Sequence, residues 1–330
     1  PVTILEKDEF GQACTKGNLG WVFPAIHAPV PEPGLILNSI KWVMKKDSPL
    51  FIKPSALPQI SGWLKQFMKF CNEESFKQGQ KALLTLSKST NFLYDELEID
   101  GVEFEMHRNG MLFLFLNSDD LNAKYDQLRY TSELYGHEIP KLLSGDEIRR
   151  MEPFVSDKVT GGIYLENQRH VDPEKLAKGF INKLKTSKAE LKPSFKVTDV
   201  EVKNNKITAV ICNQERIEGD IFLFSSGVWS GTLLNKLGYT LPVQPGKGYS
   251  ITFTKTNMHF NRPLYFGDTK AGLSPFHNAV RIGGTMEFSG LNNNIDKERI
   301  KGIKKAVSMY LKTPLKGEND FEWMGMRSMT

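Results

Sequence analysis

The first twenty residues constrain the fold of this chain most, because they combine a short apolar run, an acid and a glycine-bearing loop. Residues 2–5 are β-branched or apolar, and the acid Glu6 and the cation Lys7 follow directly. In a nucleotide-binding βαβ unit, an acid at the carboxyl end of the second strand accepts hydrogen bonds from ribose hydroxyls. We expect such a strand here, although on these residues alone an ordinary polar strand end is the simpler interpretation.

A small polar loop follows this strand and strengthens the nucleotide interpretation. Thr15 and Asn18 supply hydrogen-bond donors for phosphate oxygens, and Gly20 lets the backbone approach a cofactor closely. Cys14 and Trp21 stand on either side of these residues. In a complete unit of this kind, a strand, a G-x-G-x-x-G turn and a helix come before the strand that ends in the acid. We expect that part upstream of Pro1.

The composition fits a globular enzyme and excludes several other classes. A chain of 330 residues is long enough that we expect two domains. Its residues are 40% hydrophobic and 25% charged, which is typical of folded proteins and argues against disorder. The net charge of +5 comes from dispersed lysines, which argues against a nucleic-acid groove. Three widely separated cysteines and six histidines without metal-ligand spacing predict a reducing compartment, the cytoplasm, and no metal site. No apolar run reaches the roughly 18 to 20 residues of a membrane span.

Apolar residues at helical spacing predict several helices. Residues 35–44 form an amphipathic stripe that faces the core or, because lysines border Trp42, a membrane surface. Residues 60–71 carry a more regular stripe that faces the core. A polar helix covers about residues 119–135 and ends at Gly136.

Capping and turn signals divide the rest of the chain. Ser144 and Glu147 have capping-box spacing, and Asp172 before Pro173 starts a helix that ends near residue 185. The turn signals predict three further features: a hairpin of residues 102–107 and 111–116 around Asn109-Gly110, two strands joined at Asn204-Asn205, and a buried strand at residues 220–226 that turns at Gly227 into a helix.

Several segments together resemble the small subunit of the D-amino-acid dehydrogenases, flavoproteins of the wider D-amino-acid oxidase and glycine oxidase group. The loop at residues 14–20 is similar to the family's T-S-x-x-N-x-G, with Cys14 in place of Thr and Thr15 in place of Ser. Residues 323–330 resemble W-x-G-x-R-P-x-T, with Ser328 in place of Pro. Further similar segments are residues 28–31, 39–44, 48–50, 220–230, 242–250 and 281–287.

The resemblance implies an α/β protein in which a Rossmann-like FAD-binding domain is interleaved with an antiparallel-sheet substrate domain. Residues 1–34, 145–232 and 323–330 form the first domain, and residues 35–144 and 233–322 form the second. In relatives, the strand that contains Val197 binds the adenine through its backbone, and the turn at Gly227 lies against the cofactor. The implied FAD-binding residues are Glu6, Lys7, Cys14, Thr15, Asn18, Gly20, Trp21, Val197 and Gly227.

The same resemblance implies a substrate-binding role for Arg327. In relatives, the arginine of the W-x-G-x-R segment binds the substrate carboxylate. A guanidinium suits this task because it is permanently charged and its planar fork can bind a carboxylate through two hydrogen bonds. For Tyr249 and Arg281, in contrast, we expect a role in holding the sheet together.

The implied activity is oxidative deamination of D-amino acids to 2-oxo acids and ammonia, with hydride transfer from Cα to the flavin N5. Electrons pass to a respiratory acceptor such as quinone, and residues 41–46 are compatible with peripheral contact at the inner face of the cytoplasmic membrane. In relatives, a P-D-G-x-P segment follows the position of Thr330, and we expect it downstream of that residue. Residues 1–330 by themselves would hold flavin weakly and be inactive.

Two alternatives remain open from the sequence. The first is a dehydrogenase or oxidase of the same group that acts on a secondary amine or glycine, such as D-proline, hydroxyproline or sarcosine. The second is a non-catalytic ligand-binding or structural protein that retains the fold. The substrate side chain, the oligomeric state and any partner subunit are not decided by these residues.

Overall fold

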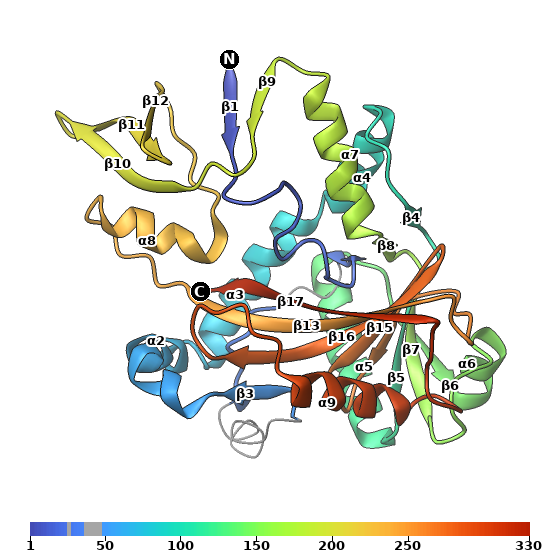
Figure 1. Ribbon diagram of the computed structural model, residues 1–330. Coiled ribbons are helices and arrows are strands. Elements are labelled where there is room, and N and C mark those ends of the chain that lie inside the picture. Colours follow the sequence, from blue (N-terminus) through green and yellow to red (C-terminus); the bar gives the residue numbers. More distant parts are fainter. Residues whose placement is uncertain (25–27, 36–47) are drawn as a thin grey trace.

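The computed structural model describes residues 1–24, 28–35 and 48–330 of the chain. A lower body is built on a nine-stranded sheet, and a smaller upper body holds the N-terminus, α7 and the short strands β9 to β12 (Figure 1). The C-terminus lies between the two bodies (Figure 1). The mixed α/β class predicted from the sequence is confirmed. The helix predicted at residues 35–44 falls almost entirely outside the described residues.

The large sheet has the order β17-β13-β16-β15-β14-β5-β7-β6, and β3 pairs with β16. Most neighbours are antiparallel, but β14 with β5 and β16 with β3 are parallel. Its strands are β3 (Leu50–Ile52), β5 (Met111–Phe115), β6 (Lys141–Ser144), β7 (Gly161–Leu165), β13 (Gln244–Thr254), β14 (Leu264–Phe266), β15 (Ala271–Phe276), β16 (Ala279–Phe288) and β17 (Asn319–Met329).

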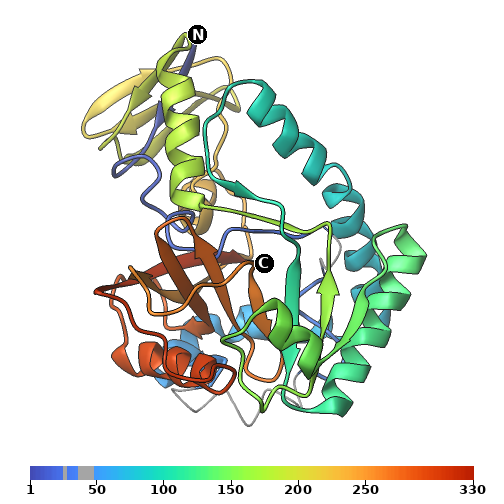
Figure 2. The same cartoon turned by 90° about the vertical axis from the view of Figure 1, so that its right-hand side faces the viewer.

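Both faces of this sheet are covered, and β5 shows why its sequence is apolar throughout. Leu112 and Leu114 belong to a core cluster that includes residues of α9 (Lys297–Ser308), such as Ile303. Phe113 and its odd-numbered neighbours instead join a second cluster with residues of α5 (Ser118–Tyr135). Because successive strand side chains point to opposite faces, a strand buried on both faces needs an unbroken apolar run. Figure 2 shows the two helices on opposite sides of the sheet.

The upper body begins with β1 (Val2–Leu5), which pairs in parallel with β9 (Ala189–Lys192). This confirms the strand predicted at residues 2–5. Asn204 and Asn205 both have positive φ and join β10 (Val197–Lys203) to β11 (Lys206–Cys212), as predicted. The remaining elements here are β12 (Glu215–Glu218), the 3-10 turn η3 (Gly227–Trp229), α7 (Pro173–Lys185) and α8 (Ser230–Asn235).

The helices with capping signals form where the sequence placed them. Ser144 and Glu147 make a full capping box at α6 (Gly145–Met151), and the Asp172 side chain caps α7. Gly136 ends α5 in the left-handed conformation, with φ of 69°. The remaining helices are the 3-10 turn η2 (Pro54–Ala56), α2 (Leu57–Lys69), α3 (Glu73–Ser87) and α4 (Thr90–Ile99).

The predicted hairpin around Asn109-Gly110 is wrong. The chain reaches Gly110 from β4 (Met106–His107), which pairs with β8 (Arg169–Val171), whereas β5 pairs with β7. Gly110 donates its backbone N–H to Gln168 O instead of closing a turn on itself. The chain therefore passes here from a three-stranded sheet, β2-β8-β4, whose third strand is β2 (Trp21–Val22), into the large sheet.

The strand predicted at residues 220–226 is also not formed. Ile221 and Leu223 are 91% and 88% exposed, and residues 220–226 pair with no strand in the described part of the chain. An apolar run becomes a strand only where a neighbouring strand completes its hydrogen bonds. The predicted turn at Gly227 is present, with φ of 58°, and α8 follows it.

Over the described ranges, no helix combines the length and the apolar character that a bilayer crossing requires.

Candidate functional site

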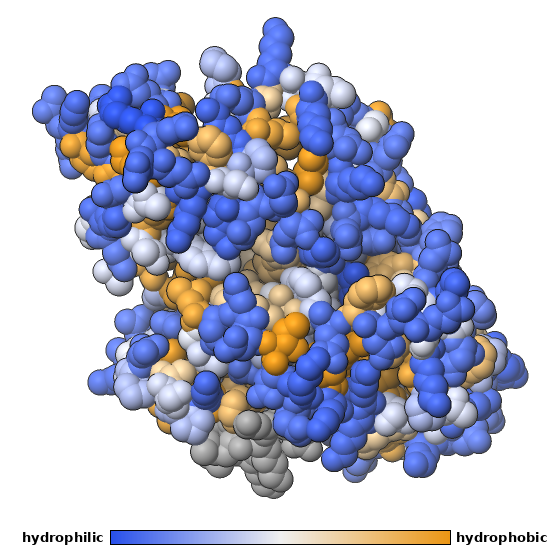
Figure 3. All heavy atoms as spheres, in the orientation of Figure 1, coloured by the Kyte–Doolittle hydropathy of each residue, from blue (hydrophilic) through white to orange (hydrophobic). Residues whose placement is uncertain are grey.

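A cavity of about 900 Å³ lies between the large sheet, α2 and the loop of residues 14–20, which we call the opening loop. Its walls are mostly apolar, and hydrophobic residues surround a hollow between the two bodies in Figure 3. Cys14, Asn18, Gly20, Trp21 and Arg327 all line this cavity, although they come from opposite ends of the chain. The apolar wall includes Leu50, Trp63, Phe67, Met286 and Met329.

Glycines in β13 and β17 keep the sheet face under the cavity flat. A Cβ atom on Gly248 would lie 2.5 Å from the Arg327 guanidinium, and one on Gly325 would lie 2.0 Å from the Trp323 ring. The Trp323 ring also covers Gly17 of the opening loop, where a Cβ would come within 2.1 Å of it. Large planar side chains can therefore rest directly on the backbone, and the opening loop is held against β17.

β17 contributes Arg327 to the cavity wall, which also includes the cation Lys270. Its side chain is open to the cavity and makes no ion pair with any residue in the described ranges. Burial lowers the pKa of this guanidinium below its ordinary value, while the nearby Cys14 acts in the opposite direction. An arginine stays charged under such a shift, so Arg327 presents an unpaired positive charge to whatever enters.

Two buried hydroxyls on the cavity wall also lack partners. Ser250 Oγ on β13 and Thr285 Oγ1 on β16 have no hydrogen bond within the described part of the chain. Thr285 has a φ of 62°, a conformation that β-branched residues rarely adopt, and it follows Gly284 within β16. A buried polar group without a partner costs free energy, so both hydroxyls suit a bound polar ligand.

The opening loop is fixed to the sheet by hydrogen bonds from several elements. The Asn18 side chain accepts from Gly20 N at 2.6 Å, and Gly20 O accepts from Val171 N at 2.8 Å. Gly20 has a φ of 68°, and a Cβ there would lie 1.9 Å from Val171 O. Trp21 Nε1 donates to Ser274 Oγ at 2.7 Å. Only glycine therefore fits at position 20, and part of the Asn18 amide serves the turn itself.

Arg281 and Tyr249 act within the protein, in line with the expectation that they hold the sheet together. Arg281 donates to Lys16 O at 3.0 Å and to Asn18 O at 2.8 Å, and so binds the opening loop to β16. Tyr249 donates to the buried Glu287 at 2.8 Å.

The remaining predicted cofactor residues form a second group at the carboxyl end of β1. Glu6 N donates to Lys192 O, and the Glu6 carboxylate accepts from Asp8 N at 3.0 Å. Lys7 Nζ lies 4.5 Å from the centre of the Trp229 ring, which follows Gly227.

This second group reaches the cavity through Gly227. A Cβ on Gly227 would lie 3.5 Å from Ser328 Oγ, next to Arg327. Val197 opens β10, close behind the residues that bond to Glu6, and Thr15 is exposed on the opening loop. Neither Val197 nor Thr15 lines the cavity. Short contacts thus connect Lys7, the turn at Gly227 and the strand segment that carries Arg327.

Comparison with known proteins decides the family. The family model described as "FAD dependent oxidoreductase", DAO, matches residues 1–330. The chain belongs to this family. Its members depend on FAD, so this protein is an FAD-dependent oxidoreductase, and the cofactor predicted from the sequence is confirmed. An extended cofactor such as FAD fits between Glu6 and Arg327. At the cavity, two hydroxyls without partners and several glycines leave room and hydrogen-bonding groups for it.

Curated relatives of this DAO-family chain carry the name D-amino acid dehydrogenase. The protein from Helicobacter pylori is 26% identical over 330 residues, which is all of this chain and 78% of the relative. The protein from Vibrio atlanticus is 25% identical over 340 residues and is covered to 80% of its length.

Solved structures share the fold at lower identity. Glycine oxidase from Bacillus cereus superposes with a TM-score of 0.68 at 19% identity, covering 99% of this chain and 76% of that one. L-proline dehydrogenase from P. horikoshii gives 0.67 at 17% identity, over 76% of this chain and 68% of that one. These matches confirm the DAO-type architecture, and the roles of individual residues remain predictions.

Sequence reasoning did not single out Ser250, Thr285 or the glycines beneath the Arg327 and Trp323 side chains, Gly248 and Gly325. Gly248 and Ser250 lie inside residues 242–250, and Thr285 lies inside residues 281–287, two segments that resemble the family. Alternation along a strand predicts which residues share a face. It could have placed Gly248 and Ser250 on one face of β13, but the bulge between Lys247 and Tyr249 breaks that simple pattern.

Proposed function

We propose that this protein is a D-amino-acid dehydrogenase. It converts a D-amino acid to an imino acid, which water hydrolyses to the 2-oxo acid and ammonia. Bound FAD supplies the acceptor for the hydride that leaves Cα. The observation that carries this proposal is Arg327: an unpaired guanidinium that faces a largely apolar cavity, beside the predicted cofactor-binding residues.

The chain's own residues would orient the amino acid and exclude water. Arg327 would bind the substrate carboxylate through charge-assisted hydrogen bonds, which its planar guanidinium can form in pairs. The apolar wall, with Trp63, Phe67 and Met286, would receive the substrate side chain. Redox chemistry of this kind needs orientation more than acid–base side chains, and the cavity wall supplies few titratable groups.

The cofactor would lie between Glu6 and Arg327. Glu6, which directly follows β1, would accept hydrogen bonds from ribose hydroxyls, and Lys7 and the backbone at Val197 would bind the same part of the cofactor. The opening loop and the Gly227 turn would hold the pyrophosphate, since both offer backbone without bulky side chains. Electrons would then pass to a respiratory acceptor such as quinone, at the inner face of the cytoplasmic membrane.

Substitution of Arg327 tests the carboxylate role in protein expressed from its complete coding sequence. Loss of a charged hydrogen bond of about 1.5–3 kcal/mol predicts a roughly 10- to 100-fold higher KM for D-alanine in Arg327→Ala. The matched control is Arg129→Ala, an exposed arginine of α5. An unchanged KM in Arg327→Ala would show that another group binds the carboxylate.

A substrate panel separates the proposal from its nearest relatives. Turnover of D-alanine, D-proline, sarcosine and glycine is measured first with a redox dye and then with oxygen as acceptor. We expect D-alanine with the dye to react fastest. A preference for D-proline, sarcosine or glycine would assign a secondary-amine or glycine specificity instead, and purified protein without flavin absorbance would favour a non-catalytic role.

A further inference from the structure

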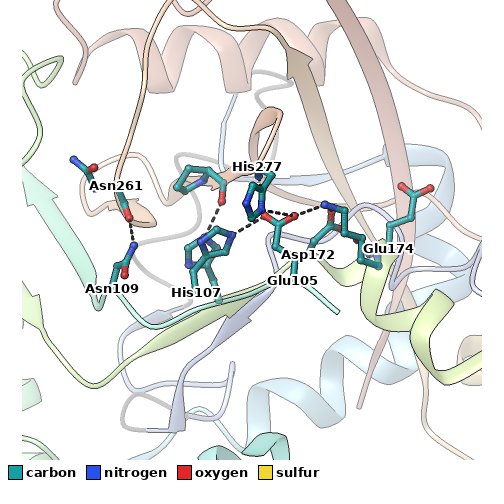
Figure 4. Close-up of polar contacts among 10 residues, drawn as sticks. Glu105, His107, Asn109, Asp172, Glu174, Asn261 and His277 are labelled. Atoms are coloured by element: carbon teal, nitrogen blue, oxygen red, sulfur yellow. Dashed lines mark hydrogen bonds and ion pairs between the residues drawn. The ribbon is translucent and has the colours of Figure 1, made fainter. Parts of the chain in front are cut away.

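A second cluster of polar side chains lies outside the flavin cavity, where no sequence motif indicated a site. Glu105 and His107 stand at β4, and His277 lies in the turn between β15 and β16. One candidate ligand atom from each of the three residues falls within 4.8 Å of the other two. Figure 4 shows both imidazoles next to the Glu105 carboxylate. None of the three residues lines the cavity.

The Glu105 carboxylate is the centre of this cluster. Its side chain is only 5% exposed, and His107 Nε2 lies 2.6 Å from Oε1 while His277 Nδ1 lies 3.4 Å from Oε2. The backbone N–H of His277 donates to Oε1 at 2.8 Å. Burial opposes the charge on Glu105, but its hydrogen bonds, first that from Lys175, outweigh burial and lower the pKa to about 2. The carboxylate is therefore ionised at neutral pH.

A buried histidine, His170, contacts the His107 ring and the strand that leads to His277. The His107 ring stacks on His170 with centroids 4.4 Å apart and planes 9° from parallel, and the two residues are paired between β4 and β8. His170 in turn bonds to Pro275 O at 2.7 Å, two residues before His277. One buried ring thus positions both the strand that carries His107 and the turn that carries His277.

We propose that Glu105, His107 and His277 bind a divalent transition-metal ion, with zinc as the best-suited ion. Two imidazole nitrogens and one carboxylate are a zinc ligand set, and the fourth position can hold water. Ligands about 2.0–2.1 Å from a tetrahedral ion lie about 3.4 Å apart, so the His277 separation already fits. The His107 separation must widen by less than about 1 Å, as the metal replaces the hydrogen bond.

The geometry also shows how a metal ion would reach the site and which group competes with it. The His277 side chain is 73% exposed, which leaves the site open to solvent on one side. Lys175 donates to the same carboxylate, and its ammonium group must move away when the ion binds. Lys175 is half exposed, so it can swing into water at little cost. The metal would then tie β4 to the β15–β16 turn.

Calorimetric titration of the complete protein with zinc chloride, together with cobalt substitution, tests the site. We expect one equivalent of zinc to bind to the wild type, and at least tenfold weaker binding to His277→Ala. His259→Ala, which removes another exposed histidine, serves as the control. Lys175→Met should bind zinc more tightly than the wild type, because the competing cation is gone.

The cobalt spectrum identifies the ligands. Binding at this site gives visible bands without the near-ultraviolet thiolate band that the exposed Cys14 would produce. No saturable binding to the wild type, equal binding to His277→Ala, or a thiolate band would each overturn the proposal. Because His277 is exposed, its replacement tests the site without threatening the core. The Lys175→Met result gives an independent reading in the opposite direction.

Discussion

At the scale of single residues, Gly248 decides where the Arg327 side chain lies. The guanidinium rests directly on the Gly248 backbone, so a methyl group there would take its place. We expect Gly248→Ala to raise the KM for a D-amino acid roughly tenfold while the fold persists, because the displaced atoms are the end of a flexible side chain. Steady-state kinetics together with a thermal melt would check this.

The control for this substitution is Gly62→Ala in α2, where an added Cβ meets nothing within 4 Å. It should leave the KM unchanged. A Gly248→Ala protein with an unaltered KM would show that Arg327 has no part in carboxylate binding, or that it binds from a different position.

Glu152 gives a second prediction at this scale, about pH. Its side chain is fully buried, accepts from Asn261 N and Arg262 Nε, and burial raises its pKa to about 7 despite these bonds. Because the pKa of Glu152 is higher in the folded than in the unfolded protein, the folded state binds the proton more tightly. This contribution to stability is complete below the pKa of the unfolded protein, near 4.5, and is lost as the pH rises towards 7. Relative to Glu152→Gln, the wild type should lose up to about 3 kcal/mol of unfolding free energy across this window.

Urea denaturation at several pH values between about 4.5 and 7 measures the difference. Parallel pH profiles for the two proteins would mean that Arg262 keeps Glu152 ionised throughout.

At the scale of elements, helix ends carry predictable signals and the Gly136 cap can be tested directly. Gly136 ends α5 with φ of 69°, and a Cβ there would meet nothing within 4 Å. Gly136→Ala should therefore destabilise the protein by about 1 kcal/mol through backbone strain alone. Gly62→Ala also faces open space but has an ordinary helical backbone, so it should stabilise α2 by about 0.5–1 kcal/mol. Stabilisation by Gly136→Ala or destabilisation by Gly62→Ala in denaturant titrations would contradict the respective expectation.

The elements also show which parts of the fold sequence reasoning could reach. Helices with local caps, such as α6 and α7, and the Asn204-Asn205 turn were predicted because their causes lie within a few residues. The hairpin at Gly110 failed because the partner of each strand is distant in the sequence. The same limit applies to residues 220–226, where an apolar pattern alone could not reveal a missing neighbour.

At the scale of the whole molecule, Arg281 joins the two bodies by holding the opening loop on β16. Lysine would keep the charge, but it lacks the planar fork that reaches Lys16 O, Asn18 O and Thr252 at once. We expect Arg281→Lys to release flavin at least about tenfold more readily and to expose residues 14–20 to proteases. Flavin fluorescence on dilution and limited proteolysis would detect these changes.

Arg216→Lys on β12 is the matched control, because Arg216 forms only exposed ion pairs. Equal flavin retention in Arg281→Lys and the wild type would show that the loop does not depend on this bridge.

The cavity around Arg327 is formed by segments from the whole chain, whereas each helix cap is formed by a few neighbouring residues. Arg327 and the opening loop could be predicted because each carries its own local pattern, but their meeting at one cavity required the fold. Ser250 and Thr285 carry no such pattern. The cluster of Glu105, His107 and His277 joins residues about 170 positions apart, so histidine spacing in the sequence predicted no metal site there.

The order of strands in the large sheet has a consequence for synthesis. β13 pairs along its full length with β17, but β14, β15, β16 and α9 leave the ribosome between them. During that interval, β13 exposes an unpaired edge and the cavity has no Arg327. Nascent chains with open strand edges are prone to intermolecular pairing, so this protein should depend on chaperones until β17 emerges. Flavin can therefore be recruited to a finished site only after translation has passed β17.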